Sequence, residues 1–130
     1  MQNAPKIHAI GIVSANIERS LDFYSKLGLD TPKFDPNEDH FHCDLGDGLF
    51  LMWDTVELVT QFMPNYEHQA GGSIGLGFDC GAPHAVDEKY ASLVAAGFES
   101  QATPWDAFWG QRYAIVKDPD GNSISIYAAL

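Results

Sequence analysis

The sequence is poor in basic residues. Its 130 residues include 7 Lys and Arg against 18 Asp and Glu, which gives a formal net charge of −11. No basic stripe is present to neutralise a phosphate backbone, which argues against nucleic acid as a partner. The chain also lacks an apolar run near the roughly 20 residues of a membrane span, and its start has no basic leader. We therefore expect a cytoplasmic protein that binds neither nucleic acid nor membranes.

Cysteine is also scarce. Cys43 and Cys80 lie in strand-like contexts without CxxC spacing. This predicts reduced, buried thiols rather than a disulfide, a zinc site or a nucleophile. Hydrophobic residues, by contrast, make up 45% of the chain and aromatic residues 12%. That content supports one substantial core and is too small for two full domains, so we expect a single domain over residues 1–130.

The hydrophobic pattern predicts the order strand, helix and three strands, twice over. The first half has a predicted strand at 6–13, a helix at 17–27, and strands near 31–34, 40–45 and 49–53. The second half has a predicted strand at 73–79, a helix from about 83 to 97, and strands near 99–105, 111–117 and 123–127. The fold class is therefore α+β, with module 1 at about 5–54, a linker at about 55–72 with one helical turn, and module 2 at about 73–130.

Short matches between the halves support a duplication. Ile10-Gly11 matches Ile74-Gly75 at an offset of 64, and the last hairpins match through Gly48 and Gly121 at an offset of 73. The second match pairs Met52 with Ser125. Agreement in element order and in hairpin glycines favours an internal duplication over chance similarity.

Two segments carry a family resemblance: "GIVSANIERSLDFYSKLGLD" and "WGQRYAIVKDPDGNSISIY". They resemble the vicinal oxygen chelate superfamily, which includes glyoxalase I, extradiol dioxygenases and bleomycin resistance proteins. The resemblance covers nearly the whole chain and implies two βαβββ modules whose curled mixed sheets form a cup around a site. It does not specify an activity.

In metal-dependent members of that superfamily, His and Glu ligands occupy four pseudosymmetric points on the cup floor. By the family's spacing and the offsets above, these points fall on Ala9, Met52, Ser73 and Ser125. None is a histidine or a carboxylate, whereas iron, manganese, nickel and zinc need several converging nitrogen or oxygen donors. We therefore predict no metal and no other cofactor.

Three histidines are the alternatives to this prediction. His8 is next to Ala9, but strand alternation turns it away from the cup unless the strand contains a bulge. His40 and His42 share one face of a strand and would suit a metal pair, although an exposed polar face is the commoner explanation. His68 and His84 have no partner at a useful spacing.

Small residues line the expected inward side of the first strand of each module. Ala9 and Gly11 in one, and Gly75 and Gly77 in the other, leave space that either a ligand or the bulky walls must fill. Pockets combine apolar walls with few polar groups, which favours a ligand. The predicted ligand-binding residues are Phe50, Met52, Trp53, Trp105, Asp106, Phe108, Trp109, Arg112, Ser125 and Tyr127.

The segment "WDAFWGQRY" at 105–113 is expected at the cup rim, where loops carry recognition. Its aromatic residues would also suit a core or a dimer contact. Asp106 can accept a hydrogen bond from a cationic or amide group and Arg112 can hold an anion, but a structural Asp106–Arg112 pair is equally open.

Together these features predict a small-molecule binding protein that needs no metal, closest to the bleomycin resistance type and a homodimer. Its ligand would be aromatic or cationic. The alternative is an enzyme: a lyase, isomerase or dioxygenase using His8, His40 or His42 with a metal, or a metal-free catalyst using Asp106 or Tyr113. A third hypothesis is a regulatory or scaffolding module whose cup holds no ligand. The sequence contains no motif that indicates a particular reaction.

Overall fold

The computed structural model describes residues 4–130. The chain forms two compact units, the first ending at His68 and the second beginning at Gln69. Each unit has one mixed sheet, with three strands in the first and four in the second. The predicted α+β class is confirmed. No helix within 4–130 is long and apolar enough to cross a membrane.

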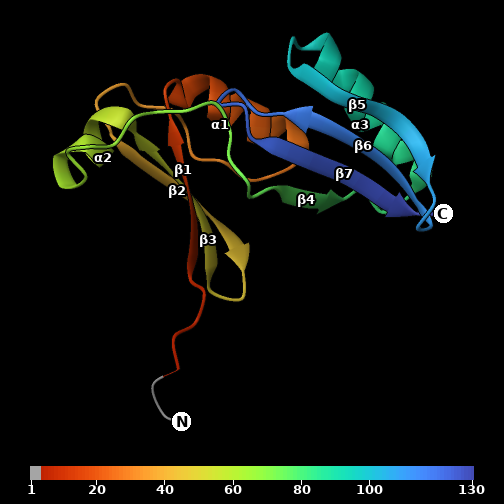
Figure 1. Ribbon diagram of the computed structural model, residues 1–130, viewed down its shortest axis with the longest axis horizontal. Helices are drawn as coiled ribbons and strands as arrows, with labels where there is room; N and C mark the ends of the chain where they lie inside the picture. The colour runs from red at the N-terminus through yellow and green to blue at the C-terminus, as the bar shows by residue number, and fades with distance from the viewer. Residues whose placement is uncertain (1–3) are drawn as a thin grey trace. The chain divides into compact units, whose positions relative to one another are not determined.

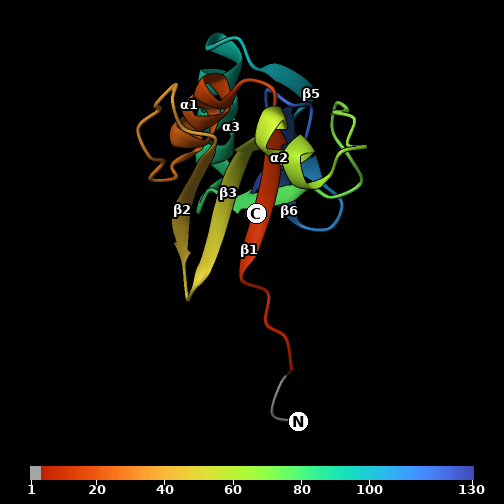
Figure 2. The ribbon, with the colours of Figure 1, turned by 90° about the vertical axis from the view of Figure 1, so that its left-hand side faces the viewer.

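In the first unit, β3 is the central strand of the sheet (Figure 2). The elements of this unit are β1 (Ala9–Ser14), α1 (Ile17–Leu27), β2 (His40–Gly46), β3 (Leu49–Thr55) and α2 (Val56–Phe62). β1 runs parallel to β3, and β2 runs antiparallel to it. The short helix α2 replaces the single helical turn expected at 55–63.

Helix α1 has the predicted ends. The Asn16 side chain accepts a hydrogen bond from the Arg19 amide, and Gly28 stops the helix with a left-handed φ of 116°. Phe23 and Tyr24, from the "ERSLDFY" segment, are fully buried, and the Tyr24 ring lies 5.6 Å from that of Trp53 in β3. The segment that carries the family resemblance therefore builds the core between α1 and the sheet.

The strand predicted near 31–34 does not form. Pro32 and Pro36 have no amide hydrogen to donate to a sheet ladder, and the Thr31 amide bonds instead to the Leu29 carbonyl in a tight turn. Phe34 stacks on Phe41 of β2, with ring centres 6.0 Å apart. The segment packs against β2 through this ring without extending the sheet.

The second unit has all five predicted elements, and α3 lies along its sheet (Figure 1). They are β4 (Leu76–Asp79), α3 (Pro83–Ala95), β5 (Glu99–Ala107), β6 (Gln111–Lys117) and β7 (Ser123–Ala129). The strand order is β4-β7-β6-β5. β4 is shorter than the predicted 73–79, and Ser73 lies outside it.

The "DPDGN" turn joins β6 to β7 and serves a structural purpose. The buried Asp118 carboxylate accepts hydrogen bonds from the amides of Asp120 and Asn122. Gly121 has a φ of 81°, and a Cβ there would lie 3.1 Å from the backbone of Ala70 and Gly71. Only glycine fits both the conformation and the close approach.

Strand pairing corrects the match between the halves. Leu51 and Ile124, both buried, are equivalent at the hairpin offset of 73. Their partners in the parallel strands are Ile10 and Leu76, an offset of 66 rather than 64. The counterpart of Ala9 is therefore Gly75 and not Ser73. A shift of two residues keeps the same side of the strand.

Candidate ligand-binding face

The sheet of the second unit has two chemically different faces. Along β6 and β7, alternate side chains are buried on the side of α3: Ala114, Val116, Ile124, Ile126 and Ala128. The intervening side chains point to the opposite side and are only partly buried. We call this opposite side the aromatic face, and define it by Trp105, Trp109, Tyr113 and Tyr127.

Three of these rings form a row across three strands. Trp105 is directly opposite Tyr113, which is directly opposite Tyr127. The Trp105 and Tyr113 ring centres are 5.3 Å apart, and the Tyr113 and Tyr127 rings stack at 5.5 Å with an interplanar angle of 9°. Offset stacks and edge contacts at these distances are favourable, so the row is a pre-organised apolar surface.

The row continues towards β4. The Tyr127 ring covers Gly77, where an added Cβ would lie 2.9 Å from both Cε2 and Oη of the tyrosine. We expected a ligand to fill the space over Gly77, but the wall residue Tyr127 fills it. Asp79 is directly opposite Tyr127 in β4 and exposed, so the row ends in a carboxylate.

The β5–β6 hairpin adds two more rings. Trp109 contacts Tyr113 and Trp105 edge to face, at 5.3 and 6.2 Å, and its indole N–H donates to the Gln111 side chain at 2.8 Å. It is still 49% exposed. Phe108 packs on Trp109 but is 96% exposed. The aromatic residues of the hairpin therefore do not belong to the core. Trp109 is half-exposed but held against its neighbours at the edge of the aromatic face, whereas Phe108 is exposed.

Asp106 and Arg112 do not belong to the aromatic face. The Arg112 guanidinium bonds Asp87 of α3 at 3.0 and 3.2 Å and Asp106 at 3.1 Å. The hydrogen bonds to Asp87 and then to Asp106 raise the Arg112 pKa above its ordinary value. The two predicted ligand contacts therefore lie on the side of the sheet opposite to the aromatic face. They form the structural pair that was the open alternative, because both side chains point to the helix side.

Ser125 and Tyr113 lie on the aromatic side of the sheet. Ser125 is partly buried between Gly77 of β4 and Ile115 of β6, one row away from Tyr127. The sequence suggests Tyr113 only as a possible acid or base, yet Tyr113 is the centre of the row. Its position follows from the strand period, since Tyr113 and Tyr127 are odd-numbered, whereas the even-numbered residues 114, 116, 124, 126 and 128 of the same strands are apolar and buried.

In the first unit, Phe50 and Met52 lie on the face away from α1, whereas Trp53 does not. Trp53 is 0% exposed and packs on Tyr24 of α1. The prediction of Trp53 as a ligand contact is wrong, because consecutive residues of a strand face opposite sides. Gly11 is paired with Met52, and nothing lies within 4 Å of where its Cβ would be.

Three histidines gather on this face of the first unit. The His8 ring lies 5.3 Å from Phe50, so it is not turned away as strand alternation predicted. It precedes β1, where the alternation begins. The His42 ring meets Phe50 edge to face at 5.6 Å, and His40 Nδ1 lies 2.6 Å from Asp54 Oδ1.

The four points that the superfamily resemblance assigns to metal ligands carry Ala9, Met52, Gly75 and Ser125 after the register correction. The correction replaces a serine with a glycine, so no histidine or carboxylate is gained. Within 4–130, no three His, Cys, Asp or Glu side chains gather as a group able to hold a metal ion.

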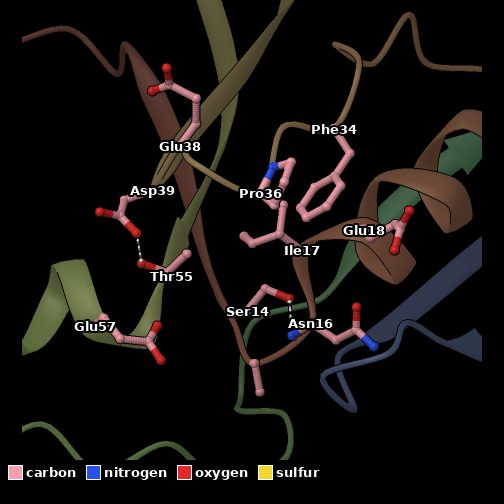
Figure 3. Close-up of a pocket in the computed structure, with 11 residues that line it drawn as sticks. Ser14, Asn16, Ile17, Glu18, Phe34, Pro36, Glu38, Asp39, Thr55 and Glu57 are labelled. Atoms are coloured by element: carbon pink, nitrogen blue, oxygen red, sulfur yellow. Dashed lines mark hydrogen bonds between the residues drawn. The ribbon is translucent and has the colours of Figure 1, made fainter.

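A cavity of about 390 Å³ in the first unit was not predicted from sequence (Figure 3). It lies where β1 leads into α1 and β3 into α2. Its lining includes the acidic residues Glu18, Glu38, Asp39 and Glu57. Asp39 accepts a hydrogen bond from the Thr55 hydroxyl at 3.0 Å, as Figure 3 shows. None of the predicted ligand-binding residues lines this cavity.

Comparison with known proteins gives the family. The model of the Glyoxalase/Bleomycin resistance protein/Dioxygenase superfamily matches residues 6–126. The chain belongs to this superfamily. No curated protein matches it significantly.

Many solved structures share the fold. A glyoxalase/bleomycin resistance protein/dioxygenase from Nocardioides is 24% identical, with a TM-score of 0.74 over 100% of this chain and 87% of that one. A glyoxalase-related enzyme from Fulvimarina pelagi is 21% identical, with a TM-score of 0.82 over 96% and 88%. A family enzyme from Burkholderia phytofirmans is 20% identical, with a TM-score of 0.79 over 95% and 98%. At these identities the similarity shows the fold alone.

Proposed function

We propose that the protein binds a small planar molecule, aromatic or cationic, on the aromatic face of the second unit, without a metal. The observation that carries the proposal is the row Trp105–Tyr113–Tyr127, whose rings are aligned in advance by cross-strand pairing and remain partly exposed. A planar ligand stacks on such a row without the cost of ordering the side chains. Such a site, which binds a small molecule without a metal, is closest to that of the bleomycin resistance type.

The charges around the row favour a cationic ligand. Asp79 ends the row, and Arg112, which precedes Tyr113 in β6, is directed to the other side of the sheet. Aromatic rings attract cations by about 0.5–1 kcal/mol at exposed sites and about 2 kcal/mol when desolvated. The formal net charge of −11 also raises the local concentration of cations.

The test is titration with planar aromatic cations and with neutral compounds of the same size, followed by intrinsic fluorescence and melting temperature. Only Trp105 and Trp109 are expected to respond, because Trp53 is buried against α1. At 100 times its dissociation constant a ligand stabilises the protein by about 2.7 kcal/mol. Chelator in the buffer should leave the affinity unchanged.

Trp109→Ala should weaken a bound cation by roughly 1–3 kcal/mol, as for a partly buried aromatic anchor, without unfolding the protein. Phe62→Ala is the matched control, since Phe62 is a 63% exposed aromatic residue of the first unit. Equal affinity in the wild type and in Trp109→Ala would contradict the assignment, as would unfolding of Trp109→Ala.

We also propose a homodimer that buries the exposed tip of the β5–β6 hairpin. Phe108 is 96% exposed, and Leu130, whose amide bonds the Gly110 carbonyl, is 62% exposed beside that hairpin. Aromatic residues exposed in this way are enriched at interfaces. Sedimentation of the wild type and of Phe108→Ser tests this: a monomeric wild type, or a variant that dimerises equally well, would contradict it.

A further inference from the structure

His40 and His42 lie on the same side of β2, outside the aromatic face. They are two residues apart, so both point away from the side that buries Phe41 and Cys43. Their ring centres are 5.4 Å apart. Two imidazoles at this spacing, both reachable from solvent, form a potential chelating pair.

The spacing agrees with two ligands of one ion. A ligating imidazole nitrogen lies about 2.0–2.1 Å from zinc, and the ring centre lies about 1 Å further along the same line. At a tetrahedral angle, the centres of two such rings are therefore about 5 Å apart. The observed 5.4 Å is close to this value.

Both rings are also held by neighbours. Asp54 lies directly opposite His40, and its Oδ1 is 2.6 Å from His40 Nδ1. A carboxylate at Nδ1 fixes the tautomer that leaves Nε2 free as a ligand, which is the arrangement around metal-bound histidines. The His42 ring is fixed edge to face against Phe50.

We propose that His40 and His42 form a divalent transition-metal site on the sheet of the first unit, with Asp54 as the positioning residue. None of the four superfamily ligand points is used. No third His, Cys, Asp or Glu completes a cage among residues 4–130. The other coordination positions are therefore open to water or to an oxygen or nitrogen donor of a small molecule, and the metal exchanges readily.

The test uses Zn²⁺ and protein without a histidine tag. Calorimetric titration should show one site, and His40→Ala and His42→Ala should each weaken it at least tenfold. Asp54→Asn should weaken it roughly 10- to 100-fold, the usual cost of losing such a partner. His84→Ala is the control, because His84 is an exposed histidine of the second unit, and its Kd should equal that of the wild type.

A second measurement needs no variant. In the wild-type protein, Zn²⁺ should shift the imidazole NMR signals of His40 and His42 and leave those of His68 and His84 in place. Equal shifts at these four of the five histidines would overturn the proposal, and so would a Kd unchanged by His40→Ala or His42→Ala. An unchanged Kd in Asp54→Asn would remove the positioning role.

Discussion

Adding one methyl group to Gly77 tests the aromatic row directly. A Cβ at Gly77 would lie 2.9 Å from Tyr127 Cε2 and Oη, whereas carbon atoms pack at about 3.5–4.0 Å. The Tyr127 ring must therefore move by about 0.6–1 Å, which separates it from Tyr113. The lost ring pair costs about 0.5–1.5 kcal/mol.

The matched control is Gly11→Ala, at the equivalent position of the first unit. Gly11 has nothing within 4 Å of its Cβ site, and neither glycine has a positive φ. Alanine should therefore stabilise the Gly11 variant by about 0.4–1 kcal/mol through the unfolded chain. The Gly77 variant has the same gain, but the displaced tyrosine offsets it.

The expected result is a free energy of unfolding about 0.5–1.5 kcal/mol lower for Gly77→Ala than for Gly11→Ala. In a chain of this size that corresponds to a melting temperature lower by about 2–6 °C. Urea denaturation gives the free energies, and near-UV circular dichroism reports the loss of ring coupling. If Gly77→Ala is at least as stable as Gly11→Ala, the Tyr127 ring does not lie over Gly77. The described arrangement of the aromatic row would then be wrong.

Three further predictions concern the core, the ion pair and the thiols. Trp53→Ala should lower the free energy of unfolding, measured by urea denaturation, by about 3–5 kcal/mol, because the side chain is fully buried. A loss below about 1 kcal/mol would mean that Trp53 lines the ligand-binding face instead of the core. Arg112→Met should lower the melting temperature, because it removes the ion pairs that join Arg112 of β6 to α3 and to β5, but it should leave ligand affinity unchanged. A loss of affinity would mean that Arg112 contacts the ligand. Burial raises the pKa of both Cys43 and Cys80 above the ordinary 9.0, so iodoacetamide should label them slowly at neutral pH in the folded protein and fast in urea. Because the folded pKa values are the higher ones, these thiols stabilise the fold most below pH 9.0, and that stability falls as pH rises further.

Local signals in the sequence predicted most of the fold. Asn16 and Gly28 mark the ends of α1 because a cap side chain and a left-handed glycine are decided by neighbours along the chain. The strand near 31–34 failed for a reason also visible in the sequence, since Pro32 and Pro36 oppose sheet pairing.

The candidate site was harder to predict. The size of Trp53 suggests a wall of the ligand site. Its neighbour Met52 is also predicted to face that site, and two consecutive residues of a strand cannot share a face. The side of the sheet that Asp106 takes depends on the register of β5, which pairs it with Arg112 of β6. The register of β5 shifts twice between Ser100 and Trp105, and such irregularities reverse the alternation without a clear sequence signal.

The corrected register shows how the two units differ in chemistry on one backbone plan. At the offset of 73, His40 and Asp54 correspond to Tyr113 and Tyr127, and each pair lies directly opposite in its own sheet. In the first unit the pair is a hydrogen-bonded imidazole and carboxylate, and in the second it is a stack of two rings. The strand that would carry a counterpart of Trp105 does not form in the first unit. That unit therefore has no third ring to extend an aromatic row, whereas its carboxylate positions His40 for the proposed metal site. We therefore expect substitutions in the second unit to weaken the binding of planar cations, and substitutions in the first unit to weaken the binding of Zn²⁺.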